Sequence, residues 1–230
     1  MKNVVILSNG PGLPEIIKKY GHSSDWIPSI VSNGNINFII KKVYEDDFEI
    51  DLDADAYILT GSKYSVYDDI DWIYKLKDFT KSLVDNNRYV LGICFGHQIL
   101  ACCLGADVKK NNLGWELGSY KIELTEEGLN NDLFNGFSSS EIVYESHQDT
   151  VLNLPPNVDV LALSDKSNQS FSYKNKVFGV QFHPEFSKEV TRMLMDLRIK
   201  KGVSIDSNIL LESDKSSSIL NNFLNIAGVN

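Results

Sequence analysis

The sequence predicts an α/β fold in which a mostly parallel central sheet is flanked by helices, with extra antiparallel strands in the C-terminal half. Two observations support this prediction. Short apolar, β-branched runs alternate with longer helical patterns in the first half of the 230-residue chain, as in folds built from strand–helix–strand units. The second half instead contains a series of short strand patterns with few helices between them.

The elements of the first half follow from apolar runs and the residues that interrupt them. Buried strands are expected at 3–8, 35–45, 55–61 and 89–93. The glycines and prolines from Gly10 to Pro14 predict a turn. Apolar residues at helical spacing predict two helices, 69–87 and 95–105. Asp69 or Asp71 is expected to cap the first helix, and Gly105 is expected to end the second.

The second half predicts strands that lie beside the main sheet or extend it. They are expected at 119–125, 141–146, 159–164, 169–173 and 176–183. Two further helices are expected at 187–202 and 213–228, the latter capped near Ser216–Ser218. The stretch 203–215 is expected to be irregular. Because no repeat, low-complexity tract or linker interrupts the pattern, residues 1–230 are expected to form a single domain.

Composition excludes several classes of protein. The chain is 43% hydrophobic and 23% charged, which suits a globular domain, and its net charge of −9 argues against a nucleic-acid partner. No apolar run has the length of a membrane span, and no signal-peptide pattern occurs, so we expect a cytoplasmic protein without membrane partners. Three cysteines, two of them adjacent, make a poor disulfide framework. Metal-ligand spacing is absent, so neither a metal nor a cofactor is expected.

The stretch Gly92-Ile93-Cys94-Phe95-Gly96 has the form glycine–x–nucleophile–x–glycine, between a predicted strand and a predicted helix. Such a turn forces an unfavourable backbone conformation on the nucleophile and leaves no room for a Cβ atom at the flanking glycines. Cys94 would then lie at the positive end of a helix, which favours its thiolate, and the Phe95 N–H would point to a developing oxyanion. The alternative is that Cys94 is an inert core residue.

The other cysteines and the histidines divide by context. Cys102 and Cys103 lie within the helix without flanking glycines, so we expect them to fill the core. His183 follows a strand, and Glu185 lies two residues further on, where its carboxylate can orient the imidazole. His97 is expected to be structural, and His22 has no supporting context. His147, in the stretch Glu-Ser-His-Gln-Asp, is a candidate for substrate binding or loop support.

Taken together, Gly92–Gln98 and His183–Glu185 resemble the class I glutamine amidotransferases, and the resemblance extends over residues 3–197. It implies a flavodoxin-like fold and hydrolysis of the side-chain amide of glutamine through a γ-glutamyl thioester, with release of ammonia. Carried over to this sequence, Cys94 is the nucleophile, His183 the general base and then acid, and Glu185 the residue that orients His183.

The resemblance also implies roles for residues around the nucleophile. The backbone N–H groups of Ser62 or Gly61 would join that of Phe95 in the oxyanion hole. The family more often has two glycines at 61–62, so Ser62 is a departure. Four residues resemble those that line the substrate pocket: Gln98, Ser146, His147 and Gln148. Two further residues, Trp115 and Glu116, are candidates for the rim of the pocket.

Within the family, the chain is most similar to the glutaminase part of GMP synthase and to stand-alone γ-glutamyl peptidases. It contains neither G-x-x-x-x-G-K-[ST] nor S-G-G-x-D-S, so we expect that it does not itself activate an acceptor. It would deliver ammonia from glutamine to an ATP-dependent synthetase subunit, or it would cleave γ-glutamyl bonds of glutathione-like compounds. A catalytically silent binding module is a third hypothesis, which the complete Cys–His–Glu set disfavours.

Overall fold

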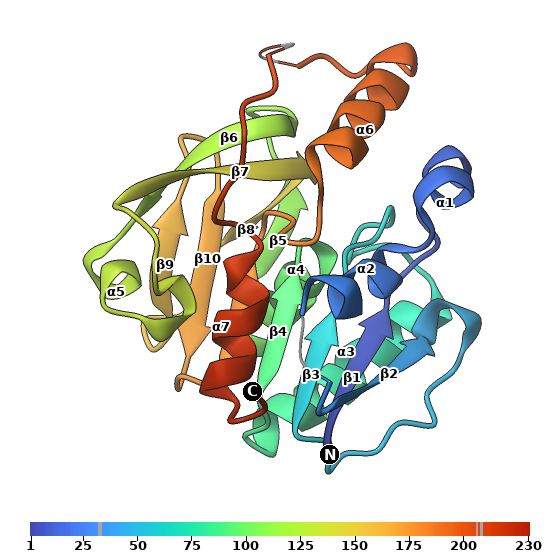
Figure 1. Ribbon diagram of the computed structural model, residues 1–230, viewed down its shortest axis with the longest axis vertical. Helices are drawn as coiled ribbons and strands as arrows, with labels where there is room; N and C mark the ends of the chain where they lie inside the picture. The colour runs from blue at the N-terminus through green and yellow to red at the C-terminus, as the bar shows by residue number, and fades with distance from the viewer. Residues whose placement is uncertain (32–33, 206, 208) are drawn as a thin grey trace.

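The chain folds around one large, strongly mixed sheet. The computed structural model describes all residues except 32, 33, 206 and 208 (Figure 1). Within this described part, nine strands form a sheet in the order β2-β1-β3-β4-β11-β10-β9-β6-β7. Their bounds are β1 Lys2–Ser8, β2 Ile36–Lys42, β3 Ala56–Leu59, β4 Val90–Ile93, β6 Glu116–Leu124, β7 Ser140–His147, β9 Asp159–Leu163, β10 Asn168–Tyr173 and β11 Val177–Val180.

The sheet has a parallel half and an antiparallel half. The pairs from β2 through β1, β3 and β4 to β11 are all parallel, whereas β10, β9, β6 and β7 continue the sheet with antiparallel pairs. A separate antiparallel pair joins β5 (Asp107–Lys110) to β8 (Asp149–Leu152). The predicted fold class, with parallel strands first and antiparallel strands in the second half, is therefore confirmed.

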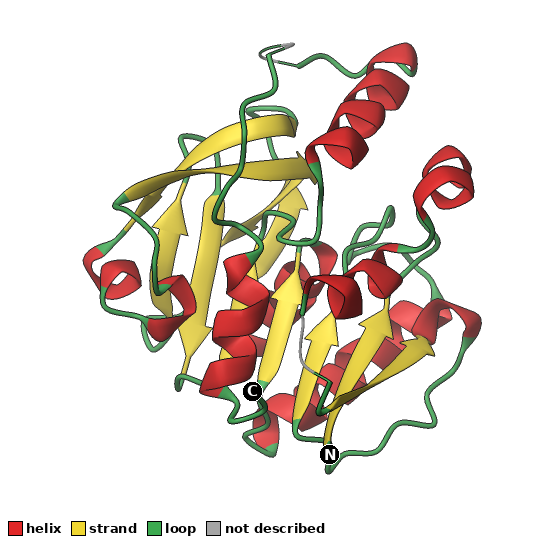
Figure 2. Cartoon of the chain, in the orientation of Figure 1, coloured by secondary structure: helices red, strands yellow, loops and turns green. Residues whose placement is uncertain are grey.

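Helices cover both faces of the sheet (Figure 2). Their bounds are α1 Pro14–Tyr20, α2 Ser23–Ile30, α3 Asp71–Asp85, α4 Phe95–Leu104, α5 Glu126–Leu129, α6 Lys188–Lys200 and α7 Ser218–Ile226, with short 3₁₀ turns η1 Val43–Glu45 and η2 Asp132–Phe134. In β1, Val4 and Ile6 belong to the core shared with α2 and α7, whereas Val5 and Leu7 belong to the core shared with α3 and α4. This alternation follows from the two-residue period of a strand.

The remaining helices lie at the carboxyl ends of the parallel strands. There α1 and α6 extend beyond the sheet (Figure 1). Within the described residues, no helix is both long enough and apolar enough to cross a lipid bilayer.

Several predicted boundaries are corrected by the structure. The turn predicted up to Pro14 ends where α1 begins, because proline at the first helical position has the required φ and needs no N–H partner. Neither Asp69 nor Asp71 caps α3: its N-cap residue is Ile70, and the Asp69 carboxylate accepts a hydrogen bond from Tyr74 Oη instead. The strand expected over 35–45 stops at Lys42, where η1 follows.

Other boundaries concern the C-terminal part of the chain. The last helix begins at Ser218, later than the expected 213, and the side chain of its N-cap residue Ser217 makes no capping hydrogen bond. The stretch 203–215 contains neither helix nor strand where it is described; residues 206 and 208 lie outside the described part.

The passage from β4 into α4 is the tightest point of the fold. A Cβ atom at Gly92 would lie 2.4 Å from the backbone of Gly96, and one at Gly96 would lie 2.4 Å from the carbonyl oxygen of Leu59 in β3. Real Cβ atoms do not approach backbone this closely, so both positions require glycine. The prediction that small residues must flank Cys94 is therefore confirmed in its steric form.

Replacing Gly96 by alanine is expected to lower the free energy of unfolding by roughly 1–3 kcal/mol, since the backbones of α4 and β3 must move apart. Urea denaturation measures this change. Gly12→Ala is the matched control, because a Cβ atom there meets only Ile17 Cγ1, at an ordinary 3.6 Å. Equal destabilisation by both substitutions would contradict the steric account.

Candidate active site

Cys94 occupies the turn between β4 and α4 in a strained conformation. Its φ is 51° and its ψ is −100°, a region that side-chain-bearing residues rarely adopt, and it is the N-cap residue of α4. Its own N–H donates to the carbonyl oxygen of Val180 in β11, at 2.8 Å. The side chain is nearly buried and lies against the unpaired N–H groups of the first turn of α4, the positive end of that helix.

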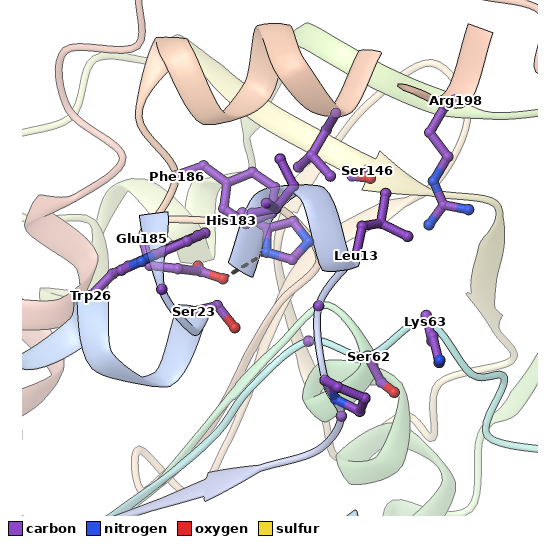
Figure 3. Close-up of a pocket in the computed structure, with 17 residues that line it drawn as sticks. Leu13, Ser23, Trp26, Ser62, Lys63, Ser146, His183, Glu185, Phe186 and Arg198 are labelled. Atoms are coloured by element: carbon purple, nitrogen blue, oxygen red, sulfur yellow. Dashed lines mark hydrogen bonds and ion pairs between the residues drawn. The ribbon is translucent and has the colours of Figure 1, made fainter. Parts of the chain in front are cut away.

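His183 and Glu185 lie just beyond the end of β11, which runs parallel to β4. The register pairs Val180 with Ile93, so the chain leaving β11 passes beside the cysteine. The His183 N–H donates to the carbonyl oxygen of Tyr144 at 2.9 Å, and its imidazole stacks on the ring of Phe186 with centroids 3.8 Å apart. His183 Nδ1 lies 2.8 Å from Glu185 Oε1 (Figure 3). The imidazole is thus held from one side by a ring and from the other by a carboxylate.

The electrostatics of this group favour a protonated imidazole. Burial acts to lower the pKa of His183, but the negative charges of Glu185 and Cys94 and their hydrogen bonds raise this pKa to about 10. Because Nδ1 bonds Glu185, Nε2 is the nitrogen available to Cys94. The structure therefore brings together the three residues that the sequence singled out as a catalytic set.

The loop after β3 lies against this group. A Cβ atom at Gly61 would come within 2.8 Å of His183 Cε1 and 3.6 Å of Cys94 Cβ, so the backbone passes directly over the pair. Ser62 and Phe95 line the same cavity as Cys94, and Ser62 Oγ accepts a hydrogen bond from the N–H of Tyr64. The three residues expected to form an oxyanion hole therefore surround the cysteine.

Two adjoining cavities open around these residues. The first, called here the cysteine cavity, has about 640 Å³ and is lined by Cys94, the loop 62–65, Gln98, Trp115 and the stretch 146–149. The second, called the α1–α6 cavity, has about 650 Å³ and includes His183 and Glu185 (Figure 3). Residues from the loop after β3, from β7 and from α6 line both cavities: Ser62, Lys63, Ser146 and Arg198. Both volumes fall within the range typical of small-molecule sites.

Gln98, Ser146, His147 and Gln148, which the sequence proposed as substrate-binding residues, all line the cysteine cavity. Gln98 Nε2 donates to the carbonyl oxygen of Asp149 and to Gln181 Oε1, which fixes the orientation of the amide. The imidazole of His147 is instead used within the protein. Its Nδ1 lies 3.0 Å from the carbonyl oxygen of Asp149, so the side chain supports the loop that lines the cavity.

His147 also belongs to a buried charge cluster that the sequence analysis missed. His147 Nε2 lies 3.1 Å from Glu145 Oε2 and 3.3 Å from Glu116 Oε2, and both glutamates are completely buried. The assignment of Glu116 to the rim of the pocket is therefore wrong, whereas Trp115 does line the cavity. The sequence carried a usable signal, because Glu145 and His147 share one face of β7 and Glu116 pairs with His147 across β6–β7.

The three groups of this cluster have different affinities for protons. Burial raises the pKa of Glu145 to about 7, against the opposing effect of His147. Burial also acts to raise the pKa of Glu116, but hydrogen bonds from His147, Ser164 and Ser167 leave this pKa lowered. Although burial acts to lower the pKa of His147, the two carboxylates raise it well above its ordinary value. The cluster therefore retains an imidazolium beside one firmly ionised carboxylate.

The remaining candidates behave as structural residues. His97 is fully buried, its ring lies 4.8 Å from that of Phe171, and burial lowers its pKa to about 3, so it stays neutral. Cys102 and Cys103 pack against the core beneath α4, as expected. Within the part of the chain that the structure describes, no cluster of His, Cys, Asp and Glu side chains is suited to a metal ion.

Comparisons with known proteins give a consistent result. Residues 24–198 match the family described as "Glutamine amidotransferase class-I". The chain is 34% identical over 188 residues to "Gamma-glutamyl peptidase 5" of Arabidopsis thaliana, covering 78% of this chain and 74% of that protein. It is 36% identical over 133 residues to the glutamine-hydrolyzing subunit of GMP synthase from Sulfolobus acidocaldarius, covering 57% of this chain and 67% of that protein.

A solved structure resembles the whole fold. The crystal structure of a glutamine amidotransferase from Thermotoga maritima aligns with a TM-score of 0.74 and 25% sequence identity, covering 98% of this chain and 96% of that one.

The raised pKa of Glu145 gives a prediction about stability. In the unfolded chain this carboxyl ionises near 4.5, whereas in the folded protein it holds its proton up to about 7. Its contribution is therefore complete below 4.5 and is lost as the pH rises through 7, by up to about 1.4 kcal/mol per pH unit. Glu145→Gln removes this titration. Urea denaturation from pH 5 to 8 should show wild type losing stability relative to the variant, and a pH-independent difference would contradict the assignment.

Proposed function

Because the chain belongs to the class I glutamine amidotransferase family, we propose that it is a cysteine hydrolase that cleaves γ-glutamyl amide bonds with Cys94 as its nucleophile. The observation that carries this proposal is the contiguous set of Cys94, His183 and Glu185, in which a buried imidazole is hydrogen-bonded on one nitrogen to a carboxylate and faces the cysteine with the other. This is the arrangement that nucleophilic acyl transfer requires.

The proposed reaction begins with acyl transfer to sulfur. The Cys94 thiolate attacks the γ-carbonyl carbon of the substrate, and a tetrahedral oxyanion forms. The backbone N–H groups of Phe95 and of Ser62 or Gly61 donate hydrogen bonds to this oxyanion. As the C–N bond breaks, His183 Nε2 gives its proton to the departing amine, which leaves a thioester on Cys94. Glu185 accepts from Nδ1–H throughout and stabilises the imidazolium.

The second half of the proposed reaction releases glutamate. His183, now neutral, takes a proton from a water molecule, and the resulting hydroxide attacks the thioester carbonyl carbon. The sulfur leaves as a thiolate beside the reformed imidazolium, which returns the enzyme to its starting state. The high pKa of His183 supports this cycle, because the imidazolium is the form that both begins and ends it.

The two arms of the substrate are assigned to different parts of the site. In the proposal, the α-amino acid end of the γ-glutamyl group lies in the cysteine cavity, where Gln98 and the stretch 146–148 offer hydrogen-bonding groups. Gln98 is held by Asp149 and Gln181, so its amide is preorganised for this contact.

We place γ-glutamyl peptidase activity first among the possible substrates. The match to a γ-glutamyl peptidase extends over three quarters of both chains, whereas the match to a glutamine-hydrolyzing component of GMP synthase covers a smaller part of this one. The second candidate is hydrolysis of glutamine with transfer of ammonia to a separate synthetase, which the sequence alone favoured. The similarity to that glutamine-hydrolyzing component supports it.

An assay of the purified chain tests the proposed nucleophile and its substrates. We expect rapid hydrolysis of γ-glutamyl dipeptides and slow hydrolysis of glutamine, and we expect Cys94→Ala to abolish both without loss of cooperative unfolding. Cys102→Ala is the matched control and should retain activity, because Cys102 lies against the core on the far side of α4. Full activity in Cys94→Ala would end the proposed mechanism. Glutamine hydrolysis that needs a synthetase partner to become rapid would favour the second candidate.

The roles of the other two residues predict an order of severity. His183→Gln should lower kcat by about 10²–10⁴-fold, the usual contribution of a positioned acid–base group. Glu185→Gln should lower kcat less, because the imidazole can still transfer protons when it is held only by Phe186. Steady-state kinetics on a γ-glutamyl dipeptide measures both effects. If Glu185→Gln proved the more damaging change, the assigned division of roles would be wrong.

A further inference from the structure

The nucleophile and the imidazole that faces it open onto different cavities. Cys94 lines the cysteine cavity, whereas His183 and Glu185 line the α1–α6 cavity. A scissile amide between sulfur and imidazole therefore places its two sides in different spaces. Its carbonyl side lies with Cys94, and its nitrogen side lies with the residue that protonates the departing amine. The leaving group is thus directed toward the α1–α6 cavity.

The wall of the α1–α6 cavity is largely apolar. It is formed by side chains from α1, α2, α6 and the turn before α6: Leu13, Ile16, Trp26, Phe186 and Leu194. Ammonia, the leaving group of glutamine, would make no use of such a wall. An amine that carries an apolar side chain would bury that side chain against it.

Arg198 lies where the two cavities meet. Its guanidinium extends from α6 toward the space opposite Leu13 and Lys63 (Figure 3). The guanidinium carbon lies 4.9 Å above the ring of Trp115, which holds the side chain in place. The Nε–H group is buried and has no hydrogen-bond acceptor, and no carboxylate among the described residues forms an ion pair with Arg198.

A cation in this state is built to receive an anion. Burial of an unpaired N–H group and partial burial of a charge both cost free energy, and a bound carboxylate would offset both through charge-assisted hydrogen bonds. Guanidinium is well suited to this contact because its donors form a planar fork that matches a carboxylate. Lys63, on the opposite side, is exposed and lies over the ring of Tyr64, so it is less constrained than Arg198.

We propose that the α1–α6 cavity is the subsite for the leaving amino acid, with its apolar side chain against the α1–α6 wall and its carboxylate on Arg198. This inference rests on the proposed function and specifies it. The preferred substrates are γ-glutamyl dipeptides whose second residue is apolar and ends in a free carboxylate. Arg198 is a specificity-determining residue in this scheme and takes no part in proton transfer.

The test combines one change in the enzyme with one change in the substrate. The substrates are γ-glutamyl-phenylalanine and γ-glutamyl-phenylalaninamide, which differ only in the negative charge. Wild type should prefer the carboxylate by about 10- to 100-fold in kcat/KM, the effect of one charged hydrogen bond. In Arg198→Gln this preference should fall to near unity, and Arg198→Lys should restore part of it.

Two controls separate specific recognition from other effects. Arg192→Gln removes the same charge from the same helix at a position that lines neither cavity, so it should keep the carboxylate preference. γ-Glutamyl-glycine tests the apolar wall and should be cleaved about 10-fold or more less efficiently than γ-glutamyl-phenylalanine. Circular dichroism and urea denaturation establish that each variant folds.

Each remaining outcome overturns a defined part of the inference. An unchanged preference in Arg198→Gln, or an equal loss on both substrates, would show that Arg198 does not bind the leaving carboxylate; the latter would assign it to the glutamyl end. Equal cleavage of the glycine and phenylalanine compounds would remove the apolar subsite. γ-Glutamyl-p-nitroanilide, which has no leaving carboxylate, reports the basal reaction. If it is cleaved in a Cys94-dependent way while these preferences are absent, only the subsite is wrong. If no γ-glutamyl compound is cleaved, the proposed function fails and the subsite with it.

Discussion

The contact between the end of β4 and its neighbouring strands is the constraint on which the site depends. Gly96 fits against the carbonyl of Leu59 in β3, and the N–H of Cys94 is bonded to Val180 in β11. These two contacts hold the cysteine at the first residue of α4, between the loops that leave β3 and β11. Because all three strands are parallel, their carboxyl ends meet at one edge of the sheet. Residues that are distant in sequence, such as Cys94 and His183, become neighbours there.

The antiparallel half of the sheet contributes support rather than chemistry. Its outermost strands carry the buried cluster of Glu116, Glu145 and His147, and His147 in turn holds the carbonyl of Asp149 beside Gln98. A buried imidazolium is costly unless its partners are close, and here two carboxylates and a carbonyl oxygen surround it. The extension of the sheet thereby fixes the loop 146–149, one wall of the cysteine cavity.

The sequence predicted the parts of the site that depend on local pattern. Two glycines around a cysteine, and a histidine followed by proline and glutamate, are constraints within a few residues, and the structure places both motifs together. Elements that are short or that depend on distant partners were missed. Helix α1 has seven residues and strands β5 and β8 have four each, too few for a periodic pattern to emerge. Glu116 was misplaced at the rim because only the pairing of β6 with β7 shows that it faces inward, and nothing near Arg198 in the sequence indicates a cavity.

The backbone of Cys94 has a consequence for how such a protein evolves. A side chain in this left-handed conformation stores strain of about 1–3 kcal/mol, which glycine at the same position would relieve. Mutational drift under selection for folding alone would therefore tend to erase the thiol. A lineage in which the cysteine persists has been under selection for its reactivity, and a descendant that gave up catalysis for a binding role would gain stability at once.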